Sequence, residues 1–169
     1  MIYENVFRSL KTQNIQYVVV GGLAVVLHGE VRFTFDLDLI VALSPKNLLR
    51  FASVMNKLGY KPRVPVAAED FANTALRESW RKEKHMKVFT FDHPKEPHFG
   101  SIDVFVYEPI PFKDLYRDRV IFRENGIEIP IVSLHHLLTL KKQADRDKDQ
   151  ADIAALEKLI QAKQSQQKK

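Results

Sequence analysis

Two aspartates early in the sequence have the spacing of a metal-binding pair. Asp36 and Asp38 are separated by one residue within the alternating run 36–41 (DLDLIV). If this run is a strand, side chains at positions i and i+2 point to the same face, so both carboxylates project together. Two carboxylates on one rigid strand are the ligands that a pair of Mg²⁺ ions needs from a protein. The run therefore predicts a site for two magnesium ions.

A pair of glycines stands ahead of this site. Gly21 and Gly22 come directly after the apolar run 17–20 (YVVV), where we expect a buried strand to end and a short helix, about residues 23–27, to begin. Glycines at such a junction let backbone N–H groups approach a phosphate, and the start of a helix favours negative charge. A phosphate-binding turn beside a metal site indicates chemistry on a nucleoside triphosphate.

A third carboxylate is expected to complete the metal site. Asp103 lies within the run 101–106 (SIDVFV), and a charged residue between branched apolar residues is costly unless it has a cation or a partner. An aspartate of an edge strand that faces water is the plainer interpretation. Asp92 is the competing candidate, but its place shortly before Pro94 is more typical of a turn. We expect Asp103 to be the third ligand.

The C-terminal part of the sequence carries a second polar cluster. Lys141 falls at helical spacing on the same face as three leucines, Leu134, Leu137 and Leu138. Such a lysine either extends to the edge of the core or reaches inward to an anion. Asp149 and Asp152 lie beside the apolar stripe of the following helix. Taken alone, this charged stretch is more typical of a solvated helix junction, but its place on the core-facing side favours a site.

The elements that must position these residues alternate along the chain. Hydrophobic periodicity predicts helices at about 3–12, 45–58, 69–81 and 133–163, the last with a break near 146–147. Strands are predicted at about 16–20, 36–43, 86–91 and 101–107, and a hairpin at 119–131 is indicated by the turn Asn125-Gly126. We expect one domain over 1–163, with an α/β catalytic part (1–131) and a helical part (133–163). Residues 164–169 are expected to be a disordered tail.

Composition narrows the class of protein. The chain has 169 residues, of which 45% are hydrophobic, and this suits one globular domain. It has no cysteine, which excludes disulfides and thiolate metal sites. It also lacks a long apolar segment, so we expect a cytoplasmic protein with no membrane partner. The net charge of +5 and the isoelectric point near 9.4 favour polyanionic partners only weakly.

The motifs together match a known pattern. Gly21-Gly22 and His28-Gly29 are followed by Arg32, Thr34, Asp36 and Asp38, and this series resembles the DNA polymerase β-like nucleotidyltransferase superfamily. It is most similar to the minimal bacterial branch that includes the AbiE-type toxins. The later series is similar to that branch as well, with Lys141, Ala144, Arg146, Lys148, Asp149 and Asp152. The resemblance covers about residues 17–156.

The resemblance implies a fold and a set of roles. The fold would be a short twisted mixed sheet flanked by helices, with a helical C-terminal part that closes the nucleotide cleft. The metal ligands would be Asp36, Asp38 and Asp103, and Asp103 would also help to deprotonate the acceptor hydroxyl. The nucleotide-binding residues would be Gly21, Gly22, Arg32, Thr34, Lys141, Arg146, Lys148 and Asp149. In this set Lys141 would contact a phosphate, and Arg32 and Thr34 would orient the carboxylate strand.

We therefore expect a Mg²⁺-dependent enzyme that moves a nucleoside monophosphate from ATP or another triphosphate to an acceptor hydroxyl. The acceptor could be RNA, such as a tRNA end, in a toxin–antitoxin or abortive-infection system with a cognate antitoxin protein. The alternatives are transfer to an aminoglycoside-like antibiotic and a non-catalytic nucleotide- or partner-binding module. RNA binding is suggested by the cations around Trp80, namely Arg77, Arg81, Lys82, Lys84 and Lys87, although most such runs are solvated helix faces.

Overall fold

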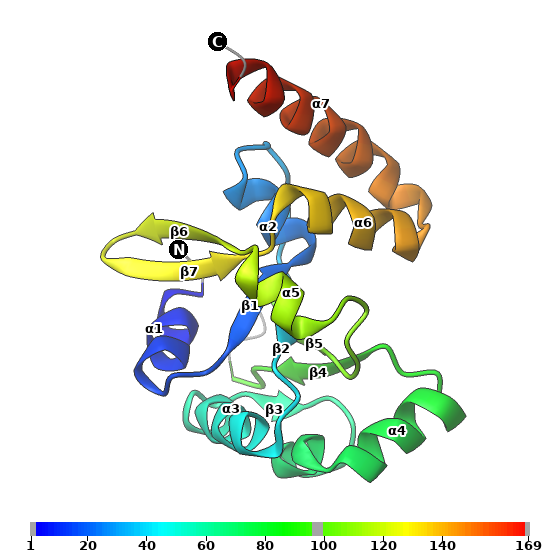
Figure 1. The fold of residues 1–169 in the computed structure, drawn as a ribbon. Helices are drawn as coiled ribbons and strands as arrows, with labels where there is room; N and C mark the ends of the chain where they lie inside the picture. The colour runs from blue at the N-terminus through cyan, green and yellow to red at the C-terminus, as the bar shows by residue number, and fades with distance from the viewer. Residues whose placement is uncertain (1–2, 96–99, 168–169) are drawn as a thin grey trace.

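The centre of the fold is a mixed β-sheet (Figure 1). The computed structural model describes residues 3–95 and 100–167. Within them, the strands of this sheet follow the order β3-β4-β5-β2-β1-β7-β6. They are β1 (Tyr17–Val20), β2 (Leu37–Val41), β3 (Lys61–Pro62), β4 (Val88–Asp92), β5 (Ile102–Phe105), β6 (Val120–Glu124) and β7 (Ile127–Ile131). The pairs β1–β7 and β2–β5 are parallel and the other neighbours are antiparallel.

Helices flank this sheet and continue beyond it. They are α1 (Glu4–Thr12), α2 (Gly21–Leu27), α3 (Pro45–Lys57), α4 (Thr74–Glu83), α5 (Phe112–Arg117), α6 (Leu134–Ala144) and α7 (Gln150–Gln167), with the 3-10 turns η1 (Ala68–Ala72) and η2 (Asp147–Asp149). In Figure 1, α6 lies beside α2, and α7 runs from the end of α6 away from the sheet. This arrangement is the mixed α/β fold with a helical C-terminal part that the resemblance implied.

Local sequence explains most of the element boundaries. Pro45 is the first residue of α3, a position where its missing N–H costs nothing. Ser133 caps α6, since its hydroxyl accepts a hydrogen bond of 3.4 Å from the backbone of His136. Asn125 and Gly126 join β6 to β7 with φ angles of +50° and +73°, as a tight hairpin requires.

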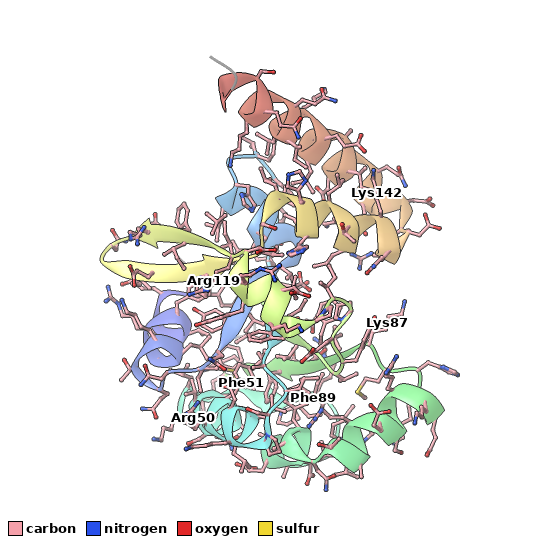
Figure 2. The ribbon with its side chains drawn as sticks, viewed as in Figure 1. Arg50, Phe51, Lys87, Phe89, Arg119 and Lys142 are labelled. Atoms are coloured by element: carbon pink, nitrogen blue, oxygen red, sulfur yellow. The ribbon has the colours of Figure 1, made fainter. Side chains whose placement is uncertain are left out.

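One face of the sheet carries the aromatic core. Phe89 and Phe91 of β4 are fully buried on this face. The ring of Phe51, from α3, lies 5.8 Å from that of Phe91, and the ring of Phe71, from η1, lies 5.0 Å from that of Phe89. Phe51 and Phe89 are labelled in Figure 2. Because this face is filled by helices, the polar residues that alternate with the core positions must project from the opposite face.

Two sequence predictions about the elements were wrong, and one helix was missed. The helix predicted at 69–81 is two elements, because the side chain of Asn73 accepts a hydrogen bond from the backbone of Leu76 and starts α4 anew. Helix α5 was not predicted. Helix α7 continues to Gln167, so residues 164–167 are helical and not part of a disordered tail.

Trp80 does not lie on the surface, where stacking on an RNA base would require it to be. Its side chain is buried at 6% exposure, and its ring stacks on Phe89 at 5.2 Å. Arg77 is also buried and donates a hydrogen bond of 2.7 Å to the carbonyl of Phe71. The basic run is therefore an amphipathic helix whose aromatic residue faces the core. Across residues 3–95 and 100–167, no helix has the length and apolar character needed to cross a membrane.

Candidate functional site

Three polar side chains form a row across the face of the sheet opposite the aromatic core. Asp38 of β2 pairs directly with Asp103 of β5, and Asp103 pairs with Thr90 of β4. Residues directly opposite each other on neighbouring strands project to the same side. The hydroxyl of Thr90 donates a hydrogen bond of 2.6 Å to Oδ1 of Asp103. The register of the sheet thus brings the two carboxylates together and fixes the rotation of one.

Asp36 lies at the entrance to β2, one residue before the strand begins. Its carboxylate is exposed, and Oδ1 accepts hydrogen bonds from Ser101, at 2.9 Å from the hydroxyl and 3.2 Å from the backbone N–H. The backbone carbonyl next to it, that of Phe35, accepts a hydrogen bond from the hydroxyl of Tyr3. Helix α1 therefore helps to fix the segment that carries Asp36.

Electrostatic repulsion is concentrated on Asp38. Burial of the Asp38 carboxyl, and after it the neighbouring charges of Asp103 and Asp36, raise its pKa to about 6. The more distant cations Lys141 and Arg146 oppose this rise only in part. A cation placed between the carboxylates would relieve the repulsion, and that is the electrostatic condition of a metal site.

The two glycines of the predicted phosphate-binding turn lie close to the side chains of Asp38, Thr34 and Arg32. Gly21 has a φ of +65°, and a Cβ at this position would collide with the carboxylate of Asp38. A Cβ at Gly22 would lie 2.7 Å from the hydroxyl of Thr34 and 3.2 Å from Cζ of Arg32. The absence of side chains here allows the backbone to approach the carboxylates on one side and the guanidinium on the other.

These residues line one cleft of about 460 Å³. One wall comes from the sheet and the following loop, with Asp36, Asp38, Asp103, Phe105, Tyr107 and Lys87. The floor and the other wall come from Gly21, Gly22, Arg32, Thr34, Leu137, Leu140, Lys141, Gln143 and Arg146. Lys87, labelled in Figure 2, is an exposed cation of this lining. The cleft thus has carboxylates at its centre, cations toward the C-terminal helices and aromatic rings beside β5.

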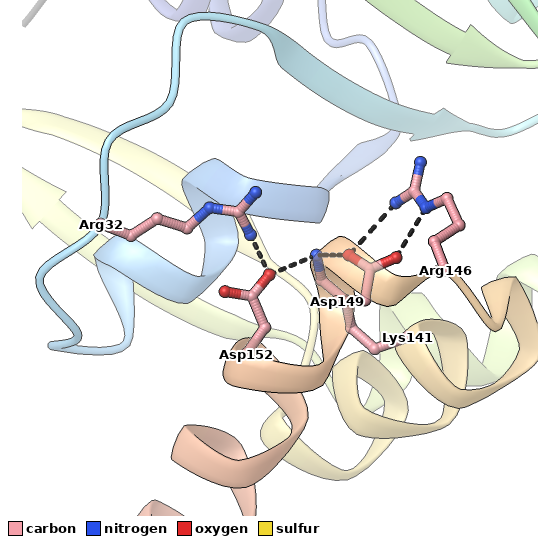
Figure 3. A network of polar contacts seen from close by, with 5 residues as sticks. All are labelled: Arg32, Lys141, Arg146, Asp149 and Asp152. Carbon is pink, nitrogen blue, oxygen red and sulfur yellow. Dashed lines mark hydrogen bonds and ion pairs between the residues drawn. The ribbon is translucent and has the colours of Figure 1, made fainter.

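A network of ion pairs supports the helical wall (Figure 3). The ammonium of Lys141 donates to Asp149 and to Asp152, each at 2.7 Å. Arg32 pairs with the same oxygen of Asp152, Oδ2. Arg146 donates to Asp149 at 2.6 Å and 3.3 Å. The network joins the loop between α2 and β2 to α6, η2 and α7.

The network is buried at its centre and carries more positive than negative charge. Lys141, Asp149 and Asp152 are 4%, 0% and 7% exposed. Burial alone would raise the pKa of Asp149, but the hydrogen bonds from Arg146 and Lys141 hold it below its ordinary value. Three cations face two carboxylates, so the group is suited to the approach of an anion.

The residues fit a magnesium site in part. Asp38 and Asp103 supply hard oxygen ligands in register, as Mg²⁺ prefers. Within the described residues, however, no three His, Asp or Glu side chains are gathered closely enough to form a complete metal site. The missing member is Asp36, whose carboxylate is turned toward Ser101. Binding of metal by all three aspartates would require the carboxylate of Asp36 to move closer to those of Asp38 and Asp103.

The structure brings most of the predicted site residues to this cleft. Asp149 lies behind it, in the supporting network, and the side chain of Lys148 is outside the described residues. Asp92 is elsewhere, in an exposed pair with Arg63 at 2.7 and 2.8 Å. The predicted set omitted Thr90 and Asp152. Asp152 was visible in the sequence as a charge beside an apolar stripe, whereas nothing in the local pattern marks Thr90.

Solved structures show the same fold. The lincosamide antibiotic adenylyltransferase LnuA is 18% identical, with a TM-score of 0.62 over 94% of this chain and 96% of that one. The antibiotic-resistance factor ANT(2″)-Ia is 12% identical, with a TM-score of 0.57 over 98% and 90%. An antigenic nucleotidyltransferase-like protein from Paracoccidioides brasiliensis is 18% identical, with a TM-score of 0.57 over 93% and 72%.

No curated protein sequence matches this chain. A family assignment comes instead from residues 2–163, which match the profile described as nucleotidyltransferase of unknown function, DUF6036. This match includes the carboxylate row, the glycine pair and the helical network. The superfamily inferred from the motifs is thereby supported, and its AbiE-type branch stays a prediction. The chain belongs to the DUF6036 family of nucleotidyltransferases.

Proposed function

We propose that this protein is a Mg²⁺-dependent nucleotidyltransferase that moves a nucleoside monophosphate from a triphosphate to an acceptor hydroxyl. The observation that carries the proposal is the pairing of Asp38 with Asp103 on parallel strands, inside a cleft that also holds Lys141. Carboxylates at the centre suit metal, and cations beside them suit phosphate. A purely structural role does not explain this pair of carboxylates, because like charges placed close together destabilise one another.

The cations at the helical end would bind the triphosphate. Arg32, Lys141 and Arg146 line this end together with Gly21 and Gly22. Their charged donors form strong hydrogen bonds to phosphate oxygens. The glycines let the backbone approach without steric hindrance. In this proposal the β- and γ-phosphates would lie toward α6 and the α-phosphate would lie near the carboxylate row.

The reaction would take place at that row. The acceptor oxygen forms a bond to the α-phosphorus, and the bond from that phosphorus to the oxygen bridging to the β-phosphate breaks, so pyrophosphate leaves. The hydroxyl proton would pass to a carboxylate oxygen of Asp103. The hydrogen bond from Thr90 holds this carboxylate in one rotation. Asp36, Asp38 and Asp103 would hold two Mg²⁺ ions. When bound, these would lower the pKa of the acceptor hydroxyl and neutralise charge on the triphosphate.

The proposal is tested by incubating the protein with Mg²⁺ and each α-³²P-labelled triphosphate, with and without total RNA. Covalent labelling of an acceptor would support the proposed activity if it does not occur in EDTA or with the Asp38→Asn variant. Binding of triphosphate with no transfer to any acceptor would instead favour the non-catalytic module. Thermal melts with and without Mg²⁺ and nucleotide measure that binding separately.

For the acceptor, we favour RNA over a cationic antibiotic. The mouth of the cleft beside β5 carries Lys87, and Arg81 lies over the ring of Tyr107 at 4.9 Å. Cations with aromatic rings bind phosphates and bases. An aminoglycoside-like acceptor would need acidic groups. Glu69 and Asp70 of η1, two carboxylates apart from the carboxylate row, accept hydrogen bonds from Asn56 and from the backbone of Ala67.

RNA transfer and antibiotic transfer are separated by charge reversal. Arg81→Glu and Lys87→Glu should lower labelling of RNA and its salt sensitivity, because fewer counterions are released on binding. Lys46→Glu, an exposed lysine at the start of α3, is the matched control. Label on an aminoglycoside alone, at low and moderate salt, would favour the antibiotic enzyme. A toxin role and a cognate antitoxin would follow only if RNA is the acceptor in cells.

A further inference from the structure

We propose that Asp152 is a positioning residue for nucleotide binding, which holds Arg32 and Lys141 at the helical end of the cleft without touching the nucleotide. The inference rests on the proposed function and concerns the same site. Its basis is that one carboxylate oxygen of α7 accepts from two cations that come from different parts of the chain. Figure 3 shows Arg32 and Lys141 reaching this oxygen from different directions.

Asp152 is the partner that the two cations share, and Lys141 also donates to Asp149 at 2.7 Å. Arg32 lies in the irregular segment between α2 and β2, and its guanidinium passes over Gly22, where there is no side chain to pack against. Lys141 is on α6 and has a long flexible side chain. Ordering such side chains costs roughly 1.5–2 kcal/mol each in lost rotamer freedom. Asp152 offsets this cost before any nucleotide arrives, and so it pre-organises the phosphate site.

The cations keep donors for a ligand while they bind Asp152. A lysine ammonium has three N–H donors, and Lys141 uses two of them on carboxylates. An arginine has five N–H donors, and the contact of Arg32 with Asp152 is made by Nη1. Both cations line the cleft, whereas Asp152 is not part of the lining. The arrangement therefore suits simultaneous contact of the cations with carboxylate behind and phosphate in front.

Two effects of Asp152 on phosphate binding oppose each other. Its negative charge weakens the attraction of the cations for phosphate, whereas its hydrogen bonds hold them in position. If charge dominated, removal of the carboxylate would tighten nucleotide binding. If position dominates, as we infer, removal weakens it. The sign of the change therefore decides between a competing charge and a positioning residue.

The test compares Asp152→Asn with Glu157→Gln in the full chain. Glu157 makes a matched control, because it accepts a bond of 2.7 Å from Lys142 and so also joins α7 to α6, but in an exposed pair. The dissociation constants of ATP, GTP, CTP and UTP are measured calorimetrically with Mg²⁺, at a temperature where each variant is folded. We expect Asp152→Asn to raise the dissociation constant of the preferred triphosphate about tenfold, the order expected for loss of one charged hydrogen bond. Glu157→Gln should change it less than twofold.

A second measurement separates positioning from a general loss of stability. Because Asp152 acts in part through Arg32, the Arg32→Ala/Asp152→Asn double variant should lose less affinity for nucleotide than the sum of the losses in the two single variants. In the ligand-free protein, hydrogen exchange of residues 29–36 should be faster in Asp152→Asn than in Glu157→Gln. Affinity that is unchanged or tighter in Asp152→Asn, or additive losses in the double variant, would overturn the inference. Failure of the unaltered protein to bind any triphosphate would contradict the proposed function itself.

Discussion

The hydroxyl of Thr90 lies 2.6 Å from a carboxylate oxygen of Asp103, across the antiparallel pair β4–β5. This hydrogen bond fixes the rotation of the Asp103 carboxylate. It therefore also sets the direction in which the other oxygen points. We expect Thr90→Val, which keeps the shape and removes the donor, to lower kcat about tenfold. The Kd for triphosphate should stay nearly constant, because Thr90 is not among the residues that line the cleft.

Thr139→Val is the control for this change. The hydroxyl of Thr139 donates to the carbonyl of His135 in its own helix, and the side chain is exposed. Its removal should leave kcat within about twofold. Equal loss of activity in the two variants would mean that Thr90 acts through stability alone.

Removal of charge at Asp38 should separate stability from catalysis. In metal-free protein, Asp38→Asn should increase the free energy of unfolding by on the order of 2 kcal/mol, because burial and two neighbouring carboxylates make the ionised form unfavourable at pH 7. Transfer activity should be abolished. The measurements are thermal melts in EDTA and in Mg²⁺ plus triphosphate, where the ligand-induced shift should be lost.

Asp92→Asn is the matched control, since it removes the charge of the rejected metal-ligand candidate. Asp92 forms an exposed ion pair with Arg63, so its loss should alter stability by less than about 1 kcal/mol. A ligand-induced shift in Asp38→Asn equal to that of the unaltered protein would disprove the metal assignment.

Lys141 and Lys142 are adjacent in sequence and should behave differently. Lys141 is buried between two carboxylates, whereas Lys142 forms an exposed pair with Glu157 (Figure 2). Lys141→Ala should destabilise the protein by roughly 3–5 kcal/mol, because it leaves buried carboxylates without their cation. It should also weaken triphosphate binding. Lys142→Ala should change each quantity little. Urea denaturation and calorimetry measure the two effects, and similar results for both lysines would contradict the phase of α6.

The stability contributed by Asp149 should depend on pH. Its pKa is held low in the folded protein, so its contribution is present above the unfolded pKa, about 3.9. It is lost as pH falls through the lower folded pKa. At pH 7, Asp149→Asn should destabilise the fold by about 1.5–3 kcal/mol. The difference from the unaltered protein should shrink below about pH 4, as measured by urea denaturation. A difference that grows on acidification would refute the assignment.

The parts of the fold that were predicted from sequence depend on local patterns. Alternation in 36–41 gave β2, and Asn125-Gly126 gave the hairpin. Helix α5 was missed because its six residues are too few for helical periodicity to be recognised. Around Trp80, the density of cations was visible but the inward rotation of the indole was not. Stacking of Trp80 on Phe89 decides which face of α4 turns toward the core.

The site was predictable where single segments carry it and not where segments meet. Asp38 and Lys141 each follow from periodicity within one element, whereas Asp36 lies one residue before β2 and its carboxylate is turned toward Ser101. Thr90 contacts Asp103 through strand register, which the sequence does not state. Arg32 was assigned to the carboxylate strand by resemblance, and its partner in the structure is Asp152 on α7. Such pairings depend on topology, so spacing along the chain gives no indication of them.

The ion pair between Arg32 and Asp152 joins residues that are 120 positions apart. At a synthesis rate of roughly 5–20 residues per second, Asp152 is added roughly 6–24 s after Arg32. By the end of that interval the growing chain contains the strands of the carboxylate row, but Arg32 still lacks its partner Asp152. We therefore expect the end of the cleft near α6 to be assembled after the carboxylate row. A nascent enzyme should acquire nucleotide binding only when α7 has emerged from the ribosome and docked.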